Sequence, residues 1–423
     1  MRRTLTLIGI VLAFRLLYAA FFAINPAGDE AYYWDWGRQL DIGYYSKPPF
    51  VAWLYAFVDW IGGGSLFAIR ATSAILGAGS LYVLFRLLCS LFDDKTAWVG
   101  VLLAITAPAN SVLSFFLTID APLILCWSTA LWMFWRYVNG ESAGGSLFFL
   151  FLALAIGHLS KQMMMIFPIL AGLFLALDAE TRPRLKDSKL LLTLFGSYLS
   201  LVPPLAWNAK NDWITFQHTQ HHFEAPEDGG NVFLDRGEDF LSFLGTQLGV
   251  LGPVTAVIVF SVALVSLPTL RKSSLPIRFL LIFGALPLAL MLLLALRQVL
   301  QPNWPAVFYV SGIGLAAAWY RGHITPSFPP QAWRRLFPVA LALSIALTTY
   351  FYLGSPLLAV LGKEGHTADP NRRLMGHGEV AMQFERTRSQ LENPGSVFLV
   401  ALGHRDVASH LAFGLPDQPR VYR

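Results

Sequence analysis

The sequence predicts an all-α polytopic membrane protein of about eleven transmembrane helices, with a small outer αβ appendage at its carboxyl end. Of the 423 residues, 55% are hydrophobic and only 13% are charged, and the mean hydropathy is +0.53. Soluble domains are less apolar than this. Apolar runs of about 20 residues, the length that spans a bilayer, recur along the chain. Lys and Arg collect in the short loops between the runs, so the net charge of +5 indicates membrane topology rather than a nucleic-acid partner.

The first apolar run, residues 4–24, resembles a signal peptide but is too long and lacks a small-residue cleavage site, so we interpret it as the first span. The fifth and sixth spans are short, so residues 146–177 form either two helices or one long broken helix. Cys89 and Cys126 lie inside apolar runs and are interpreted as core residues. The ten further spans are predicted near 65–91, 97–117, 120–138, 146–157, 162–177, 190–208, 243–267, 277–296, 304–320 and 336–356.

Basic residues in the loops set the orientation. With the amino terminus inside, the basic loops 178–189, 268–276 and 321–335 also lie inside, in agreement with the positive-inside rule. We divide the chain into a transmembrane domain, residues 1–356, and an outer carboxyl-terminal segment, residues 357–423. The transmembrane domain includes two long outer loops, residues 25–64 and 208–240. Within the outer segment, Val397–Gly403 is typical of a buried strand and the next ten residues are typical of a helix.

Nearly all of the residues that could bind a ligand or take part in a reaction fall on the outer face. Ionisable groups at membrane depth are costly and usually functional, so we predict a single outward-facing site. The stretch Gly28–Phe50, GDEAYYWDWGRQLDIGYYSKPPF, is the densest part of it. Asp29 and Glu30 are candidate general bases or ligands of a divalent cation. Asp120 either caps the helix that it begins or joins the same site. An aromatic belt with incidental charges is the alternative interpretation of the stretch.

Positive charge on this face predicts binding of a lipid-linked phosphate by Lys47, Lys161 and Arg297. Each of these alone could instead extend to the membrane surface as an anchor. No Gly-rich phosphate loop is present, so no nucleotide cofactor is expected. Four further residues are candidates to line the substrate: Tyr44, Tyr45, His158 and Asn303.

A divalent metal cation is a candidate cofactor. The stretch FQHTQHHFE places several imidazoles at helical spacing. The alternative is a solvated cluster of histidines at the membrane surface. The candidate metal ligands are Asp29, Glu30, His218, His221, His222 and Glu224.

Five blocks of sequence carry a resemblance to a known family. They are GDEAYYWDWGRQLDIGYYSKPPFVAWL, LTIDAPL, GHLSKQMMMIFP, FQHTQHHFE and QPNWPA. Together they resemble bacterial glycosyltransferase family 39, which includes protein mannosyltransferase and aminoarabinose transferase relatives within the C-type superfamily. The first block is the most specific. The likeness covers about the first 320 residues and does not extend into the carboxyl tail.

The resemblance implies a C-type glycosyltransferase in a bacterial inner membrane, with a cytoplasmic amino terminus and a periplasmic active site and carboxyl terminus. The donor would be a polyprenyl (undecaprenyl) phosphate sugar, and the acceptor lipid A, another envelope glycan or a protein. Asp29 matches the first-loop acid, a candidate base or metal residue. Asp120 matches the second acid, and Lys47 matches the lysine that contacts the donor phosphate. Ser46 stands where aminoarabinose transferases have an acid, which puts a metal site of their kind in doubt.

A transporter or flippase of lipid-linked sugars is the main alternative. The short helices around residues 157–161 fit such a protein, but transporters place their key polar groups near the membrane midplane. Here the acids lie at the outer edge, and no internal repeat is found. A third interpretation, a structural membrane protein, leaves the one-sided acids unexplained.

Overall fold

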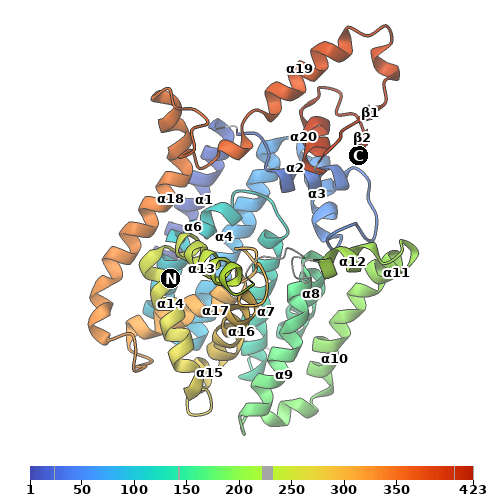
Figure 1. Ribbon diagram of the computed structural model, residues 1–423. Coiled ribbons are helices and arrows are strands. Elements are labelled where there is room, and N and C mark those ends of the chain that lie inside the picture. The colour runs from blue at the N-terminus through green and yellow to red at the C-terminus, as the bar shows by residue number, and fades with distance from the viewer. Residues whose placement is uncertain (23, 142, 222–231, 404, 423) are drawn as a thin grey trace.

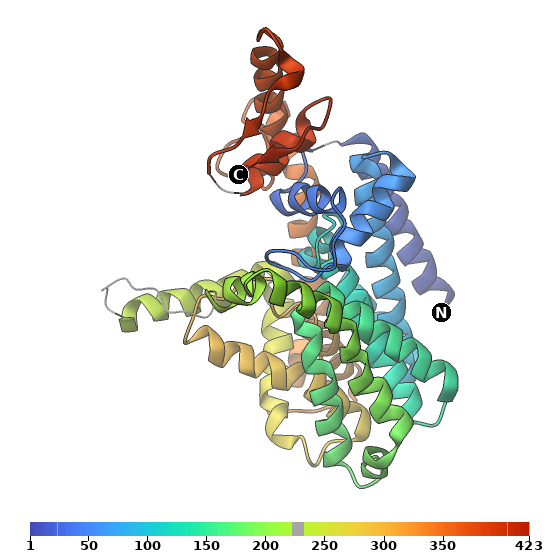
Figure 2. The ribbon, with the colours of Figure 1, turned by 90° about the vertical axis from the view of Figure 1, so that its right-hand side faces the viewer.

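The computed structural model describes residues 1–22, 24–141, 143–221, 232–403 and 405–422 (Figure 1). The described chain is mostly helical, with one two-stranded sheet near its carboxyl end. The carboxyl-terminal segment projects from one end of the helical bundle, beside the helices of the first outer loop (Figure 2).

Five helical stretches among the described residues are each long and apolar enough to cross a membrane, and a sixth is added if a bent pair of helices is counted as one span. Each predicted span contains helix here, but the count of eleven stays a prediction. The five stretches are α1 (Arg2–Phe21), α4 (Leu66–Leu91), α10 to α11 (Ser188–Lys210), α15 to α16 (Leu275–Ala295) and η6 to α18 (Gln331–Val360).

Shorter helices fill the rest of the bundle and the outer loops. The bundle contains α5 (Asp94–Thr106), α6 (Pro108–Leu113), α7 (Asp120–Val138), α8 (Ala143–Ser160), η1 (Gln162–Ile166), α9 (Phe167–Leu177), α13 (Val232–Leu251), α14 (Pro253–Ser266) and α17 (Phe308–Arg321). The outer loops contain α2 (Gly28–Gly37), α3 (Phe50–Gly62) and α12 (Ile214–His221). The carboxyl-terminal segment contains α19 (His377–Ser389), β1 (Leu399–Val400), α20 (Arg405–Gly414) and β2 (Val421–Tyr422).

Two predicted spans are interrupted. The span at 243–267 bends by 112° between α13 and α14. Gly252 takes a φ of 86°, and Pro253 begins the next helix. A glycine in the left-handed region followed by a proline ends one helix and starts another, so the Gly-Pro pair marks the bend. The span at 97–117 is divided between α5 and α6, again before a proline, Pro108.

The stretch 146–177 forms two helices. α8 ends at Ser160, and Lys161 takes an extended backbone, with φ −158° and ψ 141°, before η1 and α9 continue. Lys161 therefore lies in the break between the two helices, so the direction of its side chain is not set by helical geometry.

The loops lie at two ends of the bundle, as the sequence predicted, and contacts between loops are found at each end. At one end the amino terminus lies 3.2 Å from the Asp94 carboxylate, and His323 lies 3.3 Å from the Asp93 carboxylate. At the other end, the loops containing Asp29, Asp120 and Lys161 meet. Which end faces the cytoplasm stays a prediction.

Two hydrophobic cores matter for the site. The larger one lies between the helices of the bundle. The second is shared by the first outer loop and the carboxyl-terminal segment: Tyr33, Trp34 and Tyr55 pack in one cluster with Ala408 and other residues of the tail. A strand and a helix form where the sequence predicted them, at β1 and α20, and β1 pairs in parallel with β2. The segment is thus held by a core that it builds jointly with the loop.

Candidate active site

The two adjacent acids of the first outer loop face different surroundings because they lie in a helix. α2 begins at Gly28, so Asp29 and Glu30 occupy its first turn, where negative charge is favoured by the helix dipole. Consecutive residues in a helix are turned about 100° apart. The side chain of Asp29 is 52% exposed, whereas that of Glu30 is fully buried. Asp29 alone of this pair is open to a substrate.

Glu30 has a structural set of partners, which differs from the catalytic or metal-binding role predicted for it. One carboxylate oxygen accepts a hydrogen bond from the Ala27 N–H at 2.9 Å and lies 3.4 Å from an Arg70 nitrogen. The other oxygen accepts from the Leu117 N–H at 3.2 Å. Arg70 is also buried, with its guanidinium over the Phe115 ring. Because both oxygens are occupied inside the protein, we remove Glu30 from the residues expected to contact substrate.

Asp120 is held by two other predicted site residues. The Lys161 ammonium donates to one of its oxygens at 2.7 Å, and the Asn303 side-chain amide donates to the other at 2.7 Å. Asp120 and Lys161 are both buried. The sequence predicted each of the three for one site, and the structure joins them in a single cluster from α7, the α8 break and the segment before α17. The negative charge of Asp120 is therefore already matched by a cation.

The loop that contains Lys47 is fixed by aromatic side chains. The Tyr44 hydroxyl donates to the Gln39 carbonyl at 3.0 Å and accepts from the Asp41 N–H at 2.9 Å. The indole N–H of Trp207 donates to the Asp41 carboxylate at 2.7 Å. A Cβ on Gly43 would lie only 2.6 Å from the Trp207 ring, so this close approach requires glycine. Tyr44, predicted to line the substrate, is instead buried and shapes the loop.

The charges of the outer site perturb one another. Burial raises the pKa of the Asp29 carboxyl, and the cations of Arg405 and Lys47 partly oppose this effect. Burial also lowers the pKa of the Lys47 ammonium, and the neighbouring charge of Lys161 lowers it further. The negative charge of Asp120 raises the pKa of both groups. These mutual effects place Asp29, Lys47, Asp120 and Lys161 in one electrostatic site.

Sequence reasoning missed Arg405, which the carboxyl-terminal segment brings to this site. Its guanidinium lies 3.8 Å from the Asp29 carboxylate and 4.5 Å above the Tyr32 ring. Arg405 begins α20, whose side chains pack on α2. A helix starting with arginine at residue 405 was visible in the sequence, but nothing in its pattern indicated which loop it meets.

Several other predicted residues are not drawn into this site by described contacts. His158 is fully buried, stacked on Tyr198 with its ring 4.8 Å away. Arg297 is exposed beyond the end of α16. Tyr45 is 40% exposed and lies against the His218 ring at 4.8 Å.

The candidate metal set is not assembled in the part of the chain that the structure describes. Across those residues, no group of three or more His, Cys, Asp or Glu side chains lies close enough to hold an ion. Glu30 is occupied by Arg70, as above. His222 and Glu224, and the side chain of His221, lie outside the described residues. A metal set that includes them stays a prediction.

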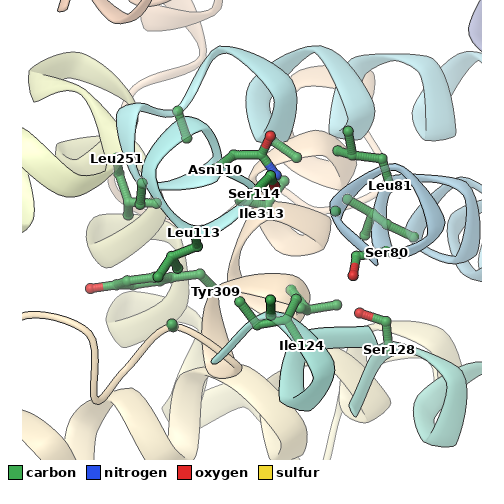
Figure 3. A pocket seen from close by; sticks show the side chains of 18 residues that line it. Ser80, Leu81, Asn110, Leu113, Ser114, Ile124, Ser128, Leu251, Tyr309 and Ile313 are labelled. Atoms are coloured by element: carbon green, nitrogen blue, oxygen red, sulfur yellow. The ribbon is translucent and has the colours of Figure 1, made fainter. Parts of the chain in front are cut away.

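A small cavity of about 90 Å³ lies deeper in the bundle, between α4, α6, α7, α13 and α17 (Figure 3). Ala121 and Ala306 line it, so it lies near the Asp120 cluster. Its polar groups are few, and Asn110 already accepts from Arg15 at 2.6 Å. A space of this size holds several waters, and we assign it no substrate.

Comparisons with known proteins identify the class of protein. A family profile described as dolichyl-phosphate-mannose-protein mannosyltransferase matches residues 46–207. The lipid A galacturonosyltransferase RgtD of Rhizobium johnstonii is 26% identical over 427 residues, covering 98% of this chain and 83% of that protein. The chain is a membrane glycosyltransferase. The resemblance noted in the sequence is thereby confirmed.

Further relatives of this glycosyltransferase fix its fold. The lipopolysaccharide core galacturonosyltransferase RgtA of the same organism is 30% identical over 205 residues, covering 45% of this chain and 41% of that protein. The structure of ArnT from Cupriavidus metallidurans bound to undecaprenyl phosphate superposes with a TM-score of 0.62 at 18% identity, covering 97% of this chain and 85% of that one. The oligosaccharyltransferase AglB from Archaeoglobus fulgidus, in complex with an inhibitory peptide and a dolichol-phosphate, gives 0.58 at 14% identity, covering 99% of this chain and 64% of that one. The C-type fold predicted from the resemblance is the fold of these structures.

Proposed function

We propose that this glycosyltransferase transfers a sugar from a polyprenyl phosphate to a hydroxyl of lipid A or the lipopolysaccharide core, on the periplasmic side of the inner membrane. The relatives supply the substrate classes: two are galacturonosyltransferases of lipid A and of the core, and one solved relative holds undecaprenyl phosphate. We take the sugar to be a uronic acid, as in the first two.

The observation that carries the mechanism is the unequal environment of the three acids. Glu30 and Asp120 are buried, and each is paired with its own cation. Asp29 is half exposed and lies at a longer distance, 3.8 Å, from Arg405. Burial raises its pKa, which makes it a stronger base than an ordinary carboxylate. We therefore assign Asp29 as the general base.

The proposed step is a single displacement. The acceptor oxygen attacks the anomeric carbon of the donor as its proton passes to the Asp29 carboxylate, and the bond from that carbon to the phosphate oxygen breaks. The electron pair leaves with the polyprenyl phosphate. The phosphate gains negative charge as it leaves, and Lys47 neutralises that charge. Phosphate is a good leaving group, so no acid is needed on its side. Attack from the face opposite the phosphate would invert the configuration of the sugar.

Asp120, Lys161 and Asn303 act as positioning residues in this proposal. Their hydrogen bonds join three separate segments of the chain at the site. Rigid support of this kind maintains the near-attack geometry on which the rate depends. A divalent cation would supply further charge neutralisation at the phosphate, but the described residues do not form a ligand set for it, and no step is assigned to it.

The test is transfer of label from a radiolabelled polyprenyl phosphate galacturonic acid to lipid A, using the intact protein in nanodiscs. We expect Asp29→Asn to lower the rate by about 10²- to 10⁴-fold, the usual contribution of a general base, while donor binding persists. Arg386→Gln, an exposed change on α19, is the matched control. Undiminished transfer by Asp29→Asn would remove Asp29 as the base. Movement of labelled lipid between leaflets without transfer would instead support a transporter.

A further inference from the structure

Arg405 is a cation of the site that the proposed reaction does not use. It comes from α20, far from the first outer loop in sequence, and its side chain is 24% exposed. Its ion pair with Asp29 measures 3.8 Å, longer than the roughly 2.7–2.9 Å of a charge-assisted hydrogen bond. Asp29 therefore does not hold the planar guanidinium tightly.

The carboxyl-terminal segment holds the Arg405 backbone firmly against α2. Trp34 of α2 and Phe413 of α20 pack edge to face, 4.9 Å between ring centroids. Arg38, at the end of α2, donates to the Gln418 carbonyl at 2.7 Å. A Cβ on Gly28 would lie 3.2 Å from the Asp406 Cβ, so the first turns of the two helices are in close contact. Arg405 is thus set on a rigid support beside the base.

The Tyr32 ring helps to position the guanidinium. Arg405 lies over this ring at 4.5 Å, an arrangement that is attractive through the negative face of the ring. A guanidinium carries five N–H donors, so its contact with Tyr32 leaves others to make hydrogen bonds. The edge of the group matches a carboxylate, which a guanidinium binds through two parallel hydrogen bonds.

The charges indicate which anion it binds. Lys161 is paired with Asp120 at 2.7 Å, which leaves Lys47 and Arg405 as cations close to Asp29. A polyprenyl phosphate uronic acid carries two anions, the phosphate and the sugar carboxylate. The two cations offer one partner to each of these anions, while Asp406, the residue after Arg405, adds a negative charge near Asp29.

We propose that Arg405 is the specificity residue that binds the carboxylate of the donor sugar. This inference rests on the proposed function. Lys47 binds the phosphate, Arg405 binds the carboxylate, and the sugar lies between them with its anomeric carbon near Asp29. The carboxyl-terminal segment would then select the sugar, while the transmembrane part binds the lipid phosphate.

The experiment compares two donors that differ only at the carboxylate, polyprenyl phosphate galacturonic acid and polyprenyl phosphate galactose. Full-length wild type, Arg405→Gln, Arg405→Lys and the Arg386→Gln control are measured in nanodiscs for donor affinity and for kcat/KM with each donor. We expect the wild type to prefer the acidic donor, and Arg405→Gln to reduce that preference by about 10- to 100-fold, the value of hydrogen bonds to a charged group. Arg405→Lys should restore part of it, because it keeps the charge and loses the planar edge.

The outcomes separate the possible sources of the anion. If Arg405→Gln weakens both donors equally, Arg405 binds the phosphate or an anionic group of the acceptor, and the proposal is overturned. The proposal is also overturned if Arg405→Gln keeps the wild-type preference for the acidic donor. If the wild type neither binds nor transfers from either donor, the proposed function fails. Thermal unfolding of each variant identifies a folding defect, and Arg405→Lys then supplies the comparison.

Discussion

Replacing Glu30 and Asp29 one at a time tests the roles assigned to them, because the first change is expected to lower stability and the second to lower the transfer rate. Glu30→Gln removes the charge that faces Arg70, whose side chain is fully buried. Arg70 then keeps its hydrogen bond to the Asn25 carbonyl, at 3.0 Å, and its contact with the Phe115 ring. Two of its guanidinium nitrogens already lack a partner among the described residues. Breaking one side of a buried ion pair costs about 3–5 kcal/mol, a large part of the roughly 5–15 kcal/mol that stabilises a typical protein.

The assay is a denaturant titration in a fixed detergent, combined with the transfer rate per folded molecule. Glu30→Gln should lose about 3–5 kcal/mol of unfolding free energy and keep most of its rate when folded. Asp29→Asn should change stability by only about 0.5 kcal/mol, as exposed positions usually do, and lose its rate. A Glu30→Gln protein as stable as the wild type but inactive would refute the structural role assigned to Glu30.

Two further predictions concern pH and the Lys47 loop. Burial raises the pKa of Asp29 and lowers that of Lys47. A plot of kcat/KM against pH should therefore rise at a pH above the ordinary carboxyl pKa range and fall at a pH below the ordinary lysine pKa range. Asp29→Asn should lack the rise on the acid side, and a rise at an unshifted carboxyl pKa would contradict the reasoning. Gly43→Ala places a Cβ 2.6 Å from Trp207 and should displace the loop, lowering kcat/KM by about 10²-fold, the effect of a 1 Å misplacement. Gly9→Ala, which meets nothing within 4 Å, is the control and should retain wild-type kinetics.

One rule indicates Asp29, Lys47, Asp120, Lys161 and Asn303 from the sequence: polar groups at the outer edge of apolar runs are there for a reason. The structure joins Asp120, Lys161 and Asn303 by hydrogen bonds. Their pairing could not be predicted, since Lys161 reaches Asp120 only because the chain breaks between two helices.

Other errors had visible signals. Asp29 and Glu30 were both predicted for the site, but they begin a helix, and helical spacing turns them to different sides. The bend at Gly252 was marked by the Gly-Pro pair. Arg405 had no such signal. Its position depends on how Ala408 and Ala412 pack on α2, a long-range contact that local patterns do not encode.

The core shared between the first outer loop and the carboxyl-terminal segment has a consequence for biosynthesis. Tyr33 and Trp34 leave the ribosome early, whereas Ala412 and Leu415, their partners in the core, are among the later residues made. Until residues 405–415 have been made, the loop that bears Asp29 lacks much of its apolar cover and the cation beside it. The proposed site is therefore completed late, and nascent chains that stall before that point lack Arg405 beside Asp29.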